Sequence, residues 1–144
     1  MKAYFSRRYR LSASHRLHND AFSDEQNWET YGKCNNPHGH GHNYVVEVTV
    51  GGPVDAQTGM VCDMVALDGA VQKEVVDRFD HTNLNLHENF QNLVPTTENL
   101  CIAIYRLLSA AVQDMPLGTA ELVRVRVEET QNNFFDYTGR QHGK

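Results

Sequence analysis

Three segments of the chain alternate apolar and polar side chains with the period of two that is typical of β-strands. They span, in chain order, residues 3–15, 43–50 and 120–129. The run Gly51-Gly52-Pro53 is predicted to end the second strand, because glycine and proline interrupt regular structure. Asn132 and Asn133 favour a turn, and a fourth, short strand is predicted over residues 134–137.

Two other segments repeat apolar residues every three or four positions, which is the period of an amphipathic helix. Asp63 can cap the first helix, which is predicted from about residue 64 to residue 79. The second begins at the polar run Pro95–Asn99 and continues to about Val112. The residues expected on the buried stripes are Leu67, Val71, Val75 and Phe79 in the first helix and Leu100, Ile104, Leu107 or Leu108, and Ala111 in the second.

The remaining segments are polar or contain residues that break regular structure. Residues 19–32 are interpreted as an insertion between two strands, with a short helix around Ser23–Tyr31. Ser23 and Gln26 have the spacing of a capping box. Residues 115–118 are predicted to end the second long helix, and residues 139–144 are expected to form a flexible tail.

The order β-β-α-α-β-β predicts a single α+β domain that takes up all 144 residues. The strands come in hairpin-like pairs, so we expect a four-stranded antiparallel sheet with two helices on one face. Such a sheet has two open edges, which favours assembly with other copies of the chain.

The net charge of −5 argues against a general binder of nucleic acid or of anionic membranes. An anionic substrate would need a local group of basic residues instead. The three cysteines are odd in number and include no C-x-x-C pair, which fits a reducing compartment. The N-terminal region has no long apolar run, so we expect a cytoplasmic protein without a signal peptide or membrane helix.

The stretch from Lys33 to Tyr44 is the most informative part of the sequence, since it holds three histidines two residues apart. In an extended chain, side chains two apart point to the same side, so His40 and His42 should converge, with His38 as another candidate. The glycines between them let the backbone approach a bound group closely. Neutral imidazoles grouped in this way suit a divalent metal, most often zinc. The alternative is a polar loop that is rich in histidine by chance.

Two polar residues fall on apolar strand faces. His15 shares its face with Leu11 and Ala13, where a lone histidine is usually a satisfied core residue. A His40–His42 pair would, however, need a third ligand, because catalytic zinc is commonly held by three protein groups. Glu129 has the parity of the valines before it, where a carboxylate is costly without partners. Either the strand ends first and Glu129 is solvated, or Glu129 faces a ligand.

The sequence also contains pieces that, in this order and spacing, resemble the family of 6-pyruvoyl-tetrahydropterin synthase and 6-carboxytetrahydropterin synthase. The resemblance covers the chain from about Phe5 to Gly139. The matching pieces are Ser12-Ala13-Ser14-His15-Arg16-Leu17, Gly32-Lys33-Cys34-Asn35-Asn36-Pro37, Gly39-His40-Gly41-His42-Asn43-Tyr44, Gly59-Met60-Val61, Asp80-His81-Thr82-Asn83-Leu84, Thr96-Thr97-Glu98-Asn99 and Glu129-Thr130-Gln131-Asn132-Asn133.

The resemblance implies the tunnelling fold (T-fold), in which subunits close into a barrel and form a homohexamer of two stacked trimers. Active sites would lie between subunits, and zinc would be held by His15, His40 and His42. The implied substrate is 7,8-dihydroneopterin triphosphate. The other residues implied are Cys34 as the catalytic thiol with Asp80 and His81 in support, and Glu129 as the anchor of the pterin with help from Thr96 and Thr97.

These residues suit the implied chemistry. Zinc can acidify C–H bonds beside the substrate's hydroxyls, and a Cys34 thiolate can take a carbon-bound proton. His81, oriented by Asp80, can move protons on and off the side-chain oxygens. The rearrangement needs no nicotinamide or flavin, and the sequence has no dinucleotide-binding glycine fingerprint. The triphosphate needs cations, and five basic residues are candidates: Arg7, Arg8, Arg10, Arg16 and Lys33.

Two features leave alternatives open. His38 creates a second register, in which Cys34 and the His38-Gly-His40 run have the spacing usual in the carboxy-synthase branch; we favour the longer register with His40 and His42. The motif also fits either product, 6-pyruvoyl-tetrahydropterin or the carboxy product with release of acetaldehyde, and we favour the first. Other classes are a non-catalytic pterin-binding protein and a structural zinc protein, which would unfold without metal.

Overall fold

The structure is a computed structural model that describes residues 1–114 and 117–139. Its strands and α-helices are, in chain order, β1 (Lys2–His15), α1 (Asp24–Tyr31), β2 (His40–Pro53), α2 (Met64–Val71), α3 (Asp77–Phe79), β3 (Thr82–Asn83), α4 (Thr97–Asp114), β4 (Glu121–Thr130) and β5 (Asn133–Tyr137). Short turns of other helix types lie between them, namely Gly32–Asn35, the π-helical Gln72–Val76, Leu84–Leu86 and Glu88–Phe90. The predicted tail beyond Gly139 and the Met115-Pro116 part of the predicted helix stop lie outside the described residues.

The α+β class is confirmed, but the prediction of four antiparallel strands is wrong. The sheet has five strands in the order β3-β1-β2-β4-β5, and it is mixed, because β3 runs parallel to β1. β3 consists of Thr82 and Asn83 alone, paired with Ala13 and Ser14. Two residues are too few to show a period, so no pattern in the sequence could mark this strand.

β2 is longer than predicted at both ends, and its C-terminal extension has a steric cause. Gly51 and Gly52 continue the strand opposite Tyr4 and Ala3 of β1. A Cβ at Gly51 would lie 2.8 Å from the Tyr4 ring, and a Cβ at Gly52 would lie 3.0 Å from the backbone of Ala120. The two glycines therefore allow close packing of neighbouring chain segments and do not end the strand.

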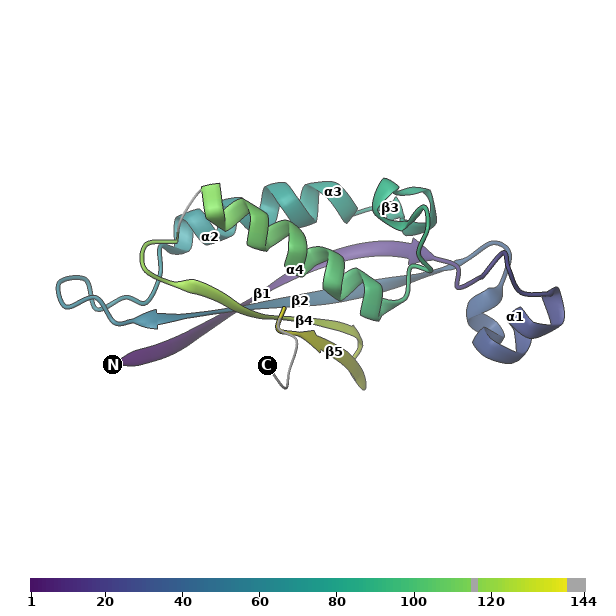
Figure 1. The fold of residues 1–144 in the computed structure, drawn as a ribbon, viewed down its shortest axis with the longest axis horizontal. Coiled ribbons are helices and arrows are strands. Elements are labelled where there is room, and N and C mark those ends of the chain that lie inside the picture. The colour runs from purple at the N-terminus through teal and green to yellow at the C-terminus, as the bar shows by residue number, and fades with distance from the viewer. Residues whose placement is uncertain (115–116, 140–144) are drawn as a thin grey trace.

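The two long helical segments cover one face of the sheet, as predicted (Figure 1). Asp63 caps α2 by accepting the Ala66 N–H at 3.0 Å, and the predicted stripe from Leu67 to Phe79 is buried. A π-helical turn, Gln72–Val76, widens this helix before α3 without interrupting the stripe. In α4 the sequence did not distinguish Leu107 from Leu108 as the inward residue. The structure buries Leu108, together with Leu100 and Ile104.

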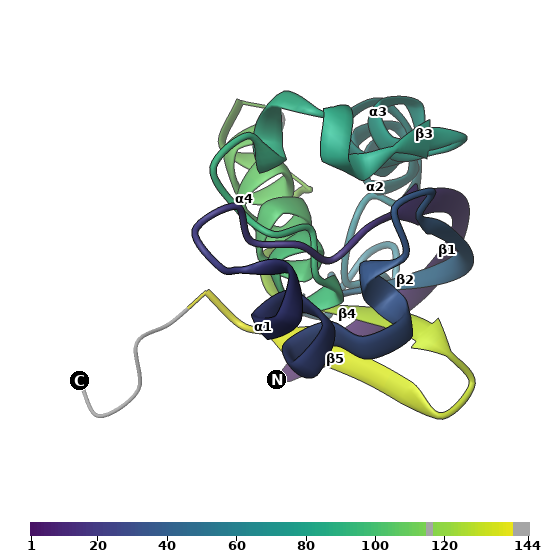
Figure 2. The same cartoon turned by 90° about the vertical axis from the view of Figure 1, so that its right-hand side faces the viewer.

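The insertion forms α1, which stands beyond the end of the sheet (Figures 1 and 2). The predicted capping box is present, since Ser23 accepts the Gln26 N–H at 3.1 Å and Gln26 accepts the Ser23 N–H at 2.9 Å. The chain then returns through the turn Gly32–Asn35 to the start of β2. This turn places Cys34 beside the end of β1.

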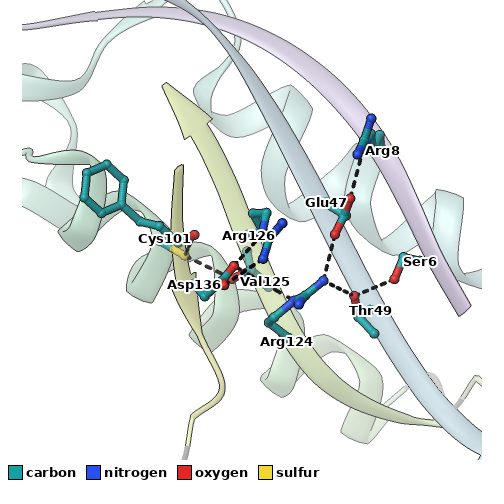
Figure 3. A network of polar contacts seen from close by, with 10 residues as sticks. Ser6, Arg8, Glu47, Thr49, Cys101, Arg124, Val125, Arg126 and Asp136 are labelled. Carbon is teal, nitrogen blue, oxygen red and sulfur yellow. Dashed lines mark hydrogen bonds and ion pairs between the residues drawn. The ribbon is translucent and has the colours of Figure 1, made fainter. Parts of the chain in front are cut away.

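The face of the sheet away from the helices carries a polar network that joins four strands (Figure 3). At its centre, the buried Glu47 of β2 accepts bonds from Arg8 of β1 at 3.0 Å and from Arg124 of β4 at 2.7 Å. Arg126 binds Asp136 of β5 with two nitrogens, at 2.7 and 3.0 Å. These charge-assisted bonds offset the cost of burying Glu47 and fix the register of the strands that carry the candidate site.

None of the helices in the described part of the chain is long and apolar enough to cross a membrane.

Candidate metal and substrate site

Three histidines meet at one end of the sheet, on the face that the helices cover. The register of β1 and β2 pairs His15 with His40 and Ala13 with His42, so strand alternation turns all three rings to the same side. One ring nitrogen of each histidine lies within 4.8 Å of those of the other two. The Nε2 atoms of His15 and His40 are 2.9 Å apart.

The surroundings of His15 and His40 favour neutral imidazoles. His15 is 1% exposed, and its Nδ1 lies 2.7 Å from the carbonyl oxygen of Pro95. A carbonyl only accepts, so Nδ1 carries the proton and Nε2 directs a lone pair toward the other rings. Burial lowers the pKa of both His15 and His40, and the neighbouring His42 lowers the pKa of His40 further. Neutral rings with lone pairs converging on one point are what a metal ligand set requires.

The geometry fits a divalent metal. Zinc–nitrogen bonds of about 2.0–2.1 Å at tetrahedral angles place two ligand nitrogens roughly 3.3 Å apart. The 2.9 Å between His15 and His40 is close to that spacing, and a cation between them would relieve the contact of two lone pairs. Three protein nitrogens would leave one position of a tetrahedral metal free for a substrate.

The loop before β2 decides which histidines join His15, either His38 and His40 or His40 and His42. Gly39 has a φ of 73°, and a Cβ there would lie 3.1 Å from the carbonyl oxygen of His15. Glycine is therefore required for this close turn. The turn leaves His38 exposed and outside the group, while His40 and His42 enter it.

Glu129 points inward, as its parity predicted. Its Oε2 accepts the Thr97 hydroxyl at 2.7 Å and lies 3.6 Å from Nε2 of His42 and 3.9 Å from Nε2 of His15. The carboxylate is partly buried and reaches the edge of the histidine group. Thr96, the other threonine of the motif, caps α4 by accepting the Asn99 N–H at 3.1 Å. The structure thus brings Thr97 to Glu129 and uses the Thr96 hydroxyl to begin the helix.

Cys34 lies next to this group, in the turn that follows α1. Its carbonyl oxygen accepts the Leu17 N–H at 2.8 Å, which ties the turn to the chain just after β1. The thiol is half-buried, and burial together with the nearby Glu129 charge raises its pKa. The thiol and the carboxylate are therefore close enough to interact electrostatically.

Asp80 and His81 lie at the edge of β1, directly before β3. Asp80 accepts the Ser12 N–H at 2.8 Å and holds Nδ1 of His81 at 3.0 Å, and the Ser12 bond together with His81 lowers the Asp80 pKa. The His81 side chain is 83% exposed and borders a hollow of about 450 Å³ that is also lined by Ser12, Asn43 and His42. His81 also has a φ of 60°, a strained value for a residue with a side chain, which fits a functional position. In one chain, no hydrogen bond or ion pair between described residues joins this pair to Cys34.

One residue of the site was missed. Tyr44 is fully buried, its hydroxyl lies 3.4 Å from Nδ1 of His15, and its ring lies 5.6 Å from that of His42. The Thr97 side chain is a polar neighbour of the same hydroxyl. Tyr44 therefore lies next to both the histidine group and the Thr97–Glu129 pair. The sequence showed it only as one more apolar-face residue of β2, although its position two after His42 placed it on the face of the histidines.

Tyr44→Phe is expected to weaken metal binding by about 10-fold, since groups that orient ligands typically contribute 10–100-fold. The ring and its packing remain, and only the hydroxyl that orients His15 and Thr97 is lost. Competition with a chromophoric chelator measures the effect. Tyr9→Phe is the matched control, because the Tyr9 hydroxyl binds Asp68 at 2.7 Å instead. Equal metal affinity of the Tyr44 variant and the wild type would contradict this role.

The chain is thus an α+β protein with a three-histidine group and an inward carboxylate at one end of its sheet. The family model described as 6-pyruvoyl tetrahydropterin synthase matches residues 4–140. A solved structure of 6-pyruvoyl tetrahydropterin synthase from Caenorhabditis elegans is similar at a TM-score of 0.89 and 40% identity, covering 97% of both chains. The 6-pyruvoyl tetrahydrobiopterin synthase of Drosophila melanogaster is 44% identical over 138 residues, which is 95% of this chain and 80% of the relative.

The chain belongs to the 6-pyruvoyl tetrahydropterin synthase family, which confirms the resemblance seen in the sequence. A more distant relative, the 6-carboxy-5,6,7,8-tetrahydropterin synthase of Bacillus subtilis, is 31% identical over 119 residues, 80% of this chain and 77% of the relative.

Proposed function

We propose that this chain is an enzyme that converts 7,8-dihydroneopterin triphosphate to 6-pyruvoyl-tetrahydropterin with elimination of triphosphate. The observation that carries the proposal is the meeting of a three-histidine group, an inward carboxylate and a half-buried thiol at one end of the sheet. The pyruvoyl product is supported by the relatives: the Drosophila relative named for it is 44% identical over 138 residues, whereas two relatives named for the carboxy product are 39% identical over 95 residues and 31% identical over 119 residues. The reaction makes the chain a carbon–oxygen lyase acting on a phosphate.

Zinc is the proposed metal, held by His15, His40 and His42. Bound there, it supplies Lewis acidity that makes the C–H bonds beside the substrate's side-chain hydroxyls more acidic. The chain's own contribution is to favour the neutral form of His15 and His40 by burial, which lowers the pKa of both, and to aim His15 through its bond to Pro95. An all-nitrogen set of three imidazoles suits zinc among the divalent metals.

Glu129 would hold the pterin by its aminopyrimidinone edge. That edge presents two N–H donors side by side, and a carboxylate can accept both in paired, charge-assisted bonds. Thr97 fixes the carboxylate through Oε2, so the group is oriented before substrate binds. Once ionised, the Cys34 thiol would take a proton from the substrate's side chain.

Asp80 and His81 would act on the side-chain oxygens from a neighbouring copy. Within one chain they lie at the edge of β1, and among the described residues no hydrogen bond or ion pair joins them to Cys34, which supports a site shared between copies. Open strand edges support assembly: among the described residues, β3 covers β1 only at Ala13 and Ser14, and no strand covers the outer side of β5. We propose that copies join through such edges into the T-fold barrel and a hexamer.

A product assay tests the proposed function. Zinc-loaded protein is given dihydroneopterin triphosphate under anaerobic conditions, pterins are followed by mass spectrometry, and acetaldehyde by a coupled assay. The expected result is 6-pyruvoyl-tetrahydropterin and triphosphate without acetaldehyde. Acetaldehyde with a carboxylated tetrahydropterin would place the chain in the carbon–carbon lyase branch, and no turnover with zinc bound would favour a binding protein.

A further inference from the structure

The five basic residues considered for the triphosphate differ in what they already bind. Arg7 forms an ion pair with Asp68 at 3.0 Å, and Arg8 binds Glu47 at the same distance within the sheet network. Arg10 pairs with Val45 in mid-strand, on the outer face of the sheet and away from the histidine group. Arg16 and Lys33 are left beside the site, because Arg16 follows His15 and Lys33 precedes Cys34.

Arg16 is held firmly at three points. Asn85 accepts its backbone N–H at 2.6 Å and donates to its carbonyl oxygen at 2.8 Å. Its Nε donates to the carbonyl oxygen of Asn35, next to Cys34, at 3.0 Å. Among the described residues no hydrogen bond or ion pair uses its two terminal nitrogens. The guanidinium is thus fixed in place with its two-nitrogen end available, whereas Lys33 is an exposed side chain with no such anchor.

The side chain borders a polar hollow of about 400 Å³. Pro95, whose carbonyl binds His15, is part of its wall, and Asn19, Asn85 and Gln91 contribute amide side chains. His18 also lines it, and the one acidic residue on the rim, Asp20, is fully exposed and lies 3.3 Å from the His18 ring. The hollow therefore offers a fixed cation and neutral amide donors in a chain whose net charge is −5.

We propose that the Arg16 guanidinium, at the edge of this hollow, binds the phosphate chain of the triphosphate substrate. The proposal rests on the proposed function, since it assigns the part of that substrate that Glu129 and the histidines do not hold. Two terminal N–H groups in a plane can bind two phosphate oxygens at once, which an ammonium group cannot do. Arg16 would then set the preference for a triphosphate over the pterin without phosphates.

The test compares ligands with and without phosphates on Arg16→Gln, Arg16→Lys and the control Arg106→Gln, an exposed arginine on the outer side of α4. The measurements are the KM for the triphosphate substrate, the Kd for inorganic tripolyphosphate by calorimetry and the Kd for 7,8-dihydroneopterin. Arg16→Gln is expected to raise the KM for the triphosphate substrate and the Kd for tripolyphosphate by about 10- to 100-fold, which is the range for lost charge-assisted hydrogen bonds. The Kd for 7,8-dihydroneopterin should stay within about 2-fold of the wild-type value. Arg16→Lys should recover part of the loss, and Arg106→Gln should behave as the wild type.

Two results would overturn the assignment: equal weakening of dihydroneopterin and tripolyphosphate, which indicates a structural role, or unchanged values for both. Circular dichroism of each variant separates misfolding from lost binding, and the lysine variant keeps the proposal testable if the glutamine variant misfolds. If the wild type binds tripolyphosphate through Arg16 but does not turn over the substrate, the anion site stands and the proposed reaction fails.

Discussion

Replacing Cys34 with alanine is expected to lower kcat by about 10²–10⁴-fold, the usual contribution of a general base, while metal and pterin still bind. The reason is geometric: Cys34 lies beside the histidine group and Glu129 but supplies no nitrogen ligand and no carboxylate. Steady-state turnover, zinc content and the Kd for dihydroneopterin measure the three quantities separately.

Cys62→Ala is the matched control for this variant. Cys62 is a buried thiol in a different part of the chain, beside Asp63 at the start of α2, and the proposed mechanism does not use it. Its loss should leave kcat unchanged. Full turnover in Cys34→Ala would refute the role of the thiol, and loss of zinc in that variant would show a structural effect instead.

Mixing two inactive variants extends the same experiment to the assembly. If Cys34 works with His81 of a neighbouring copy, Cys34→Ala and His81→Ala subunits that are mixed one to one and reassembled should regain about a quarter of the wild-type turnover. A site is intact only where its Cys34 comes from a His81→Ala subunit and its His81 from a Cys34→Ala subunit. Random assembly gives that combination at about one site in four. If both residues acted within one chain, no intact site would form. The absence of any recovery in reassembled mixtures would contradict a site shared between neighbouring copies.

The sequence predicted those parts of the site that depend on strand parity. His15, His40, His42 and Glu129 were all placed on inward faces because a period of two carries over from the visible valines to the polar residues at the strand ends. Tyr44 has the same parity and was still missed. Its apolar ring satisfied the pattern, and nothing in a pattern shows a hydroxyl reaching His15.

Other features depend on contacts between distant segments, which no local pattern contains. The pairing of Thr82 with Ala13 joins residues 69 positions apart, and it places Asp80 and His81 at the edge of β1. Arg16 could not be separated from Arg7 and Arg8 until Asp68 and Glu47 were seen to bind those two. Gly51 likewise had the composition of a turn, and only the Tyr4 ring beside it explains its place within β2. The sequence therefore predicts well which face of a strand a side chain occupies, and predicts poorly which distant residue that side chain contacts.

Replacing Glu129 with glutamine is expected to weaken pterin binding and to make the nearby Cys34 thiol more reactive. The Kd for dihydroneopterin should rise by about 10²-fold, because a glutamine amide offers one acceptor where the pterin edge presents two donors, and the charge assistance is lost. The Cys34 thiol should become more reactive. Burial and the Glu129 charge raise its pKa, and the substitution removes the second of these causes, so the thiolate fraction at neutral pH increases.

The rate of alkylation by iodoacetamide as a function of pH measures the thiol, and Cys34→Ala identifies its contribution, since Cys62 and Cys101 are buried. Glu128→Gln is the matched control, because the same charge is removed one residue earlier, from a side chain that points to the other face of β4. That control should leave the Kd for dihydroneopterin and the alkylation rate of Cys34 unchanged. Undiminished pterin affinity in Glu129→Gln would exclude the carboxylate as the anchor. An unchanged Cys34 pKa would show that the two groups are not coupled, whereas the expected decrease means that a pterin which neutralises Glu129 also promotes ionisation of the thiol that acts on it.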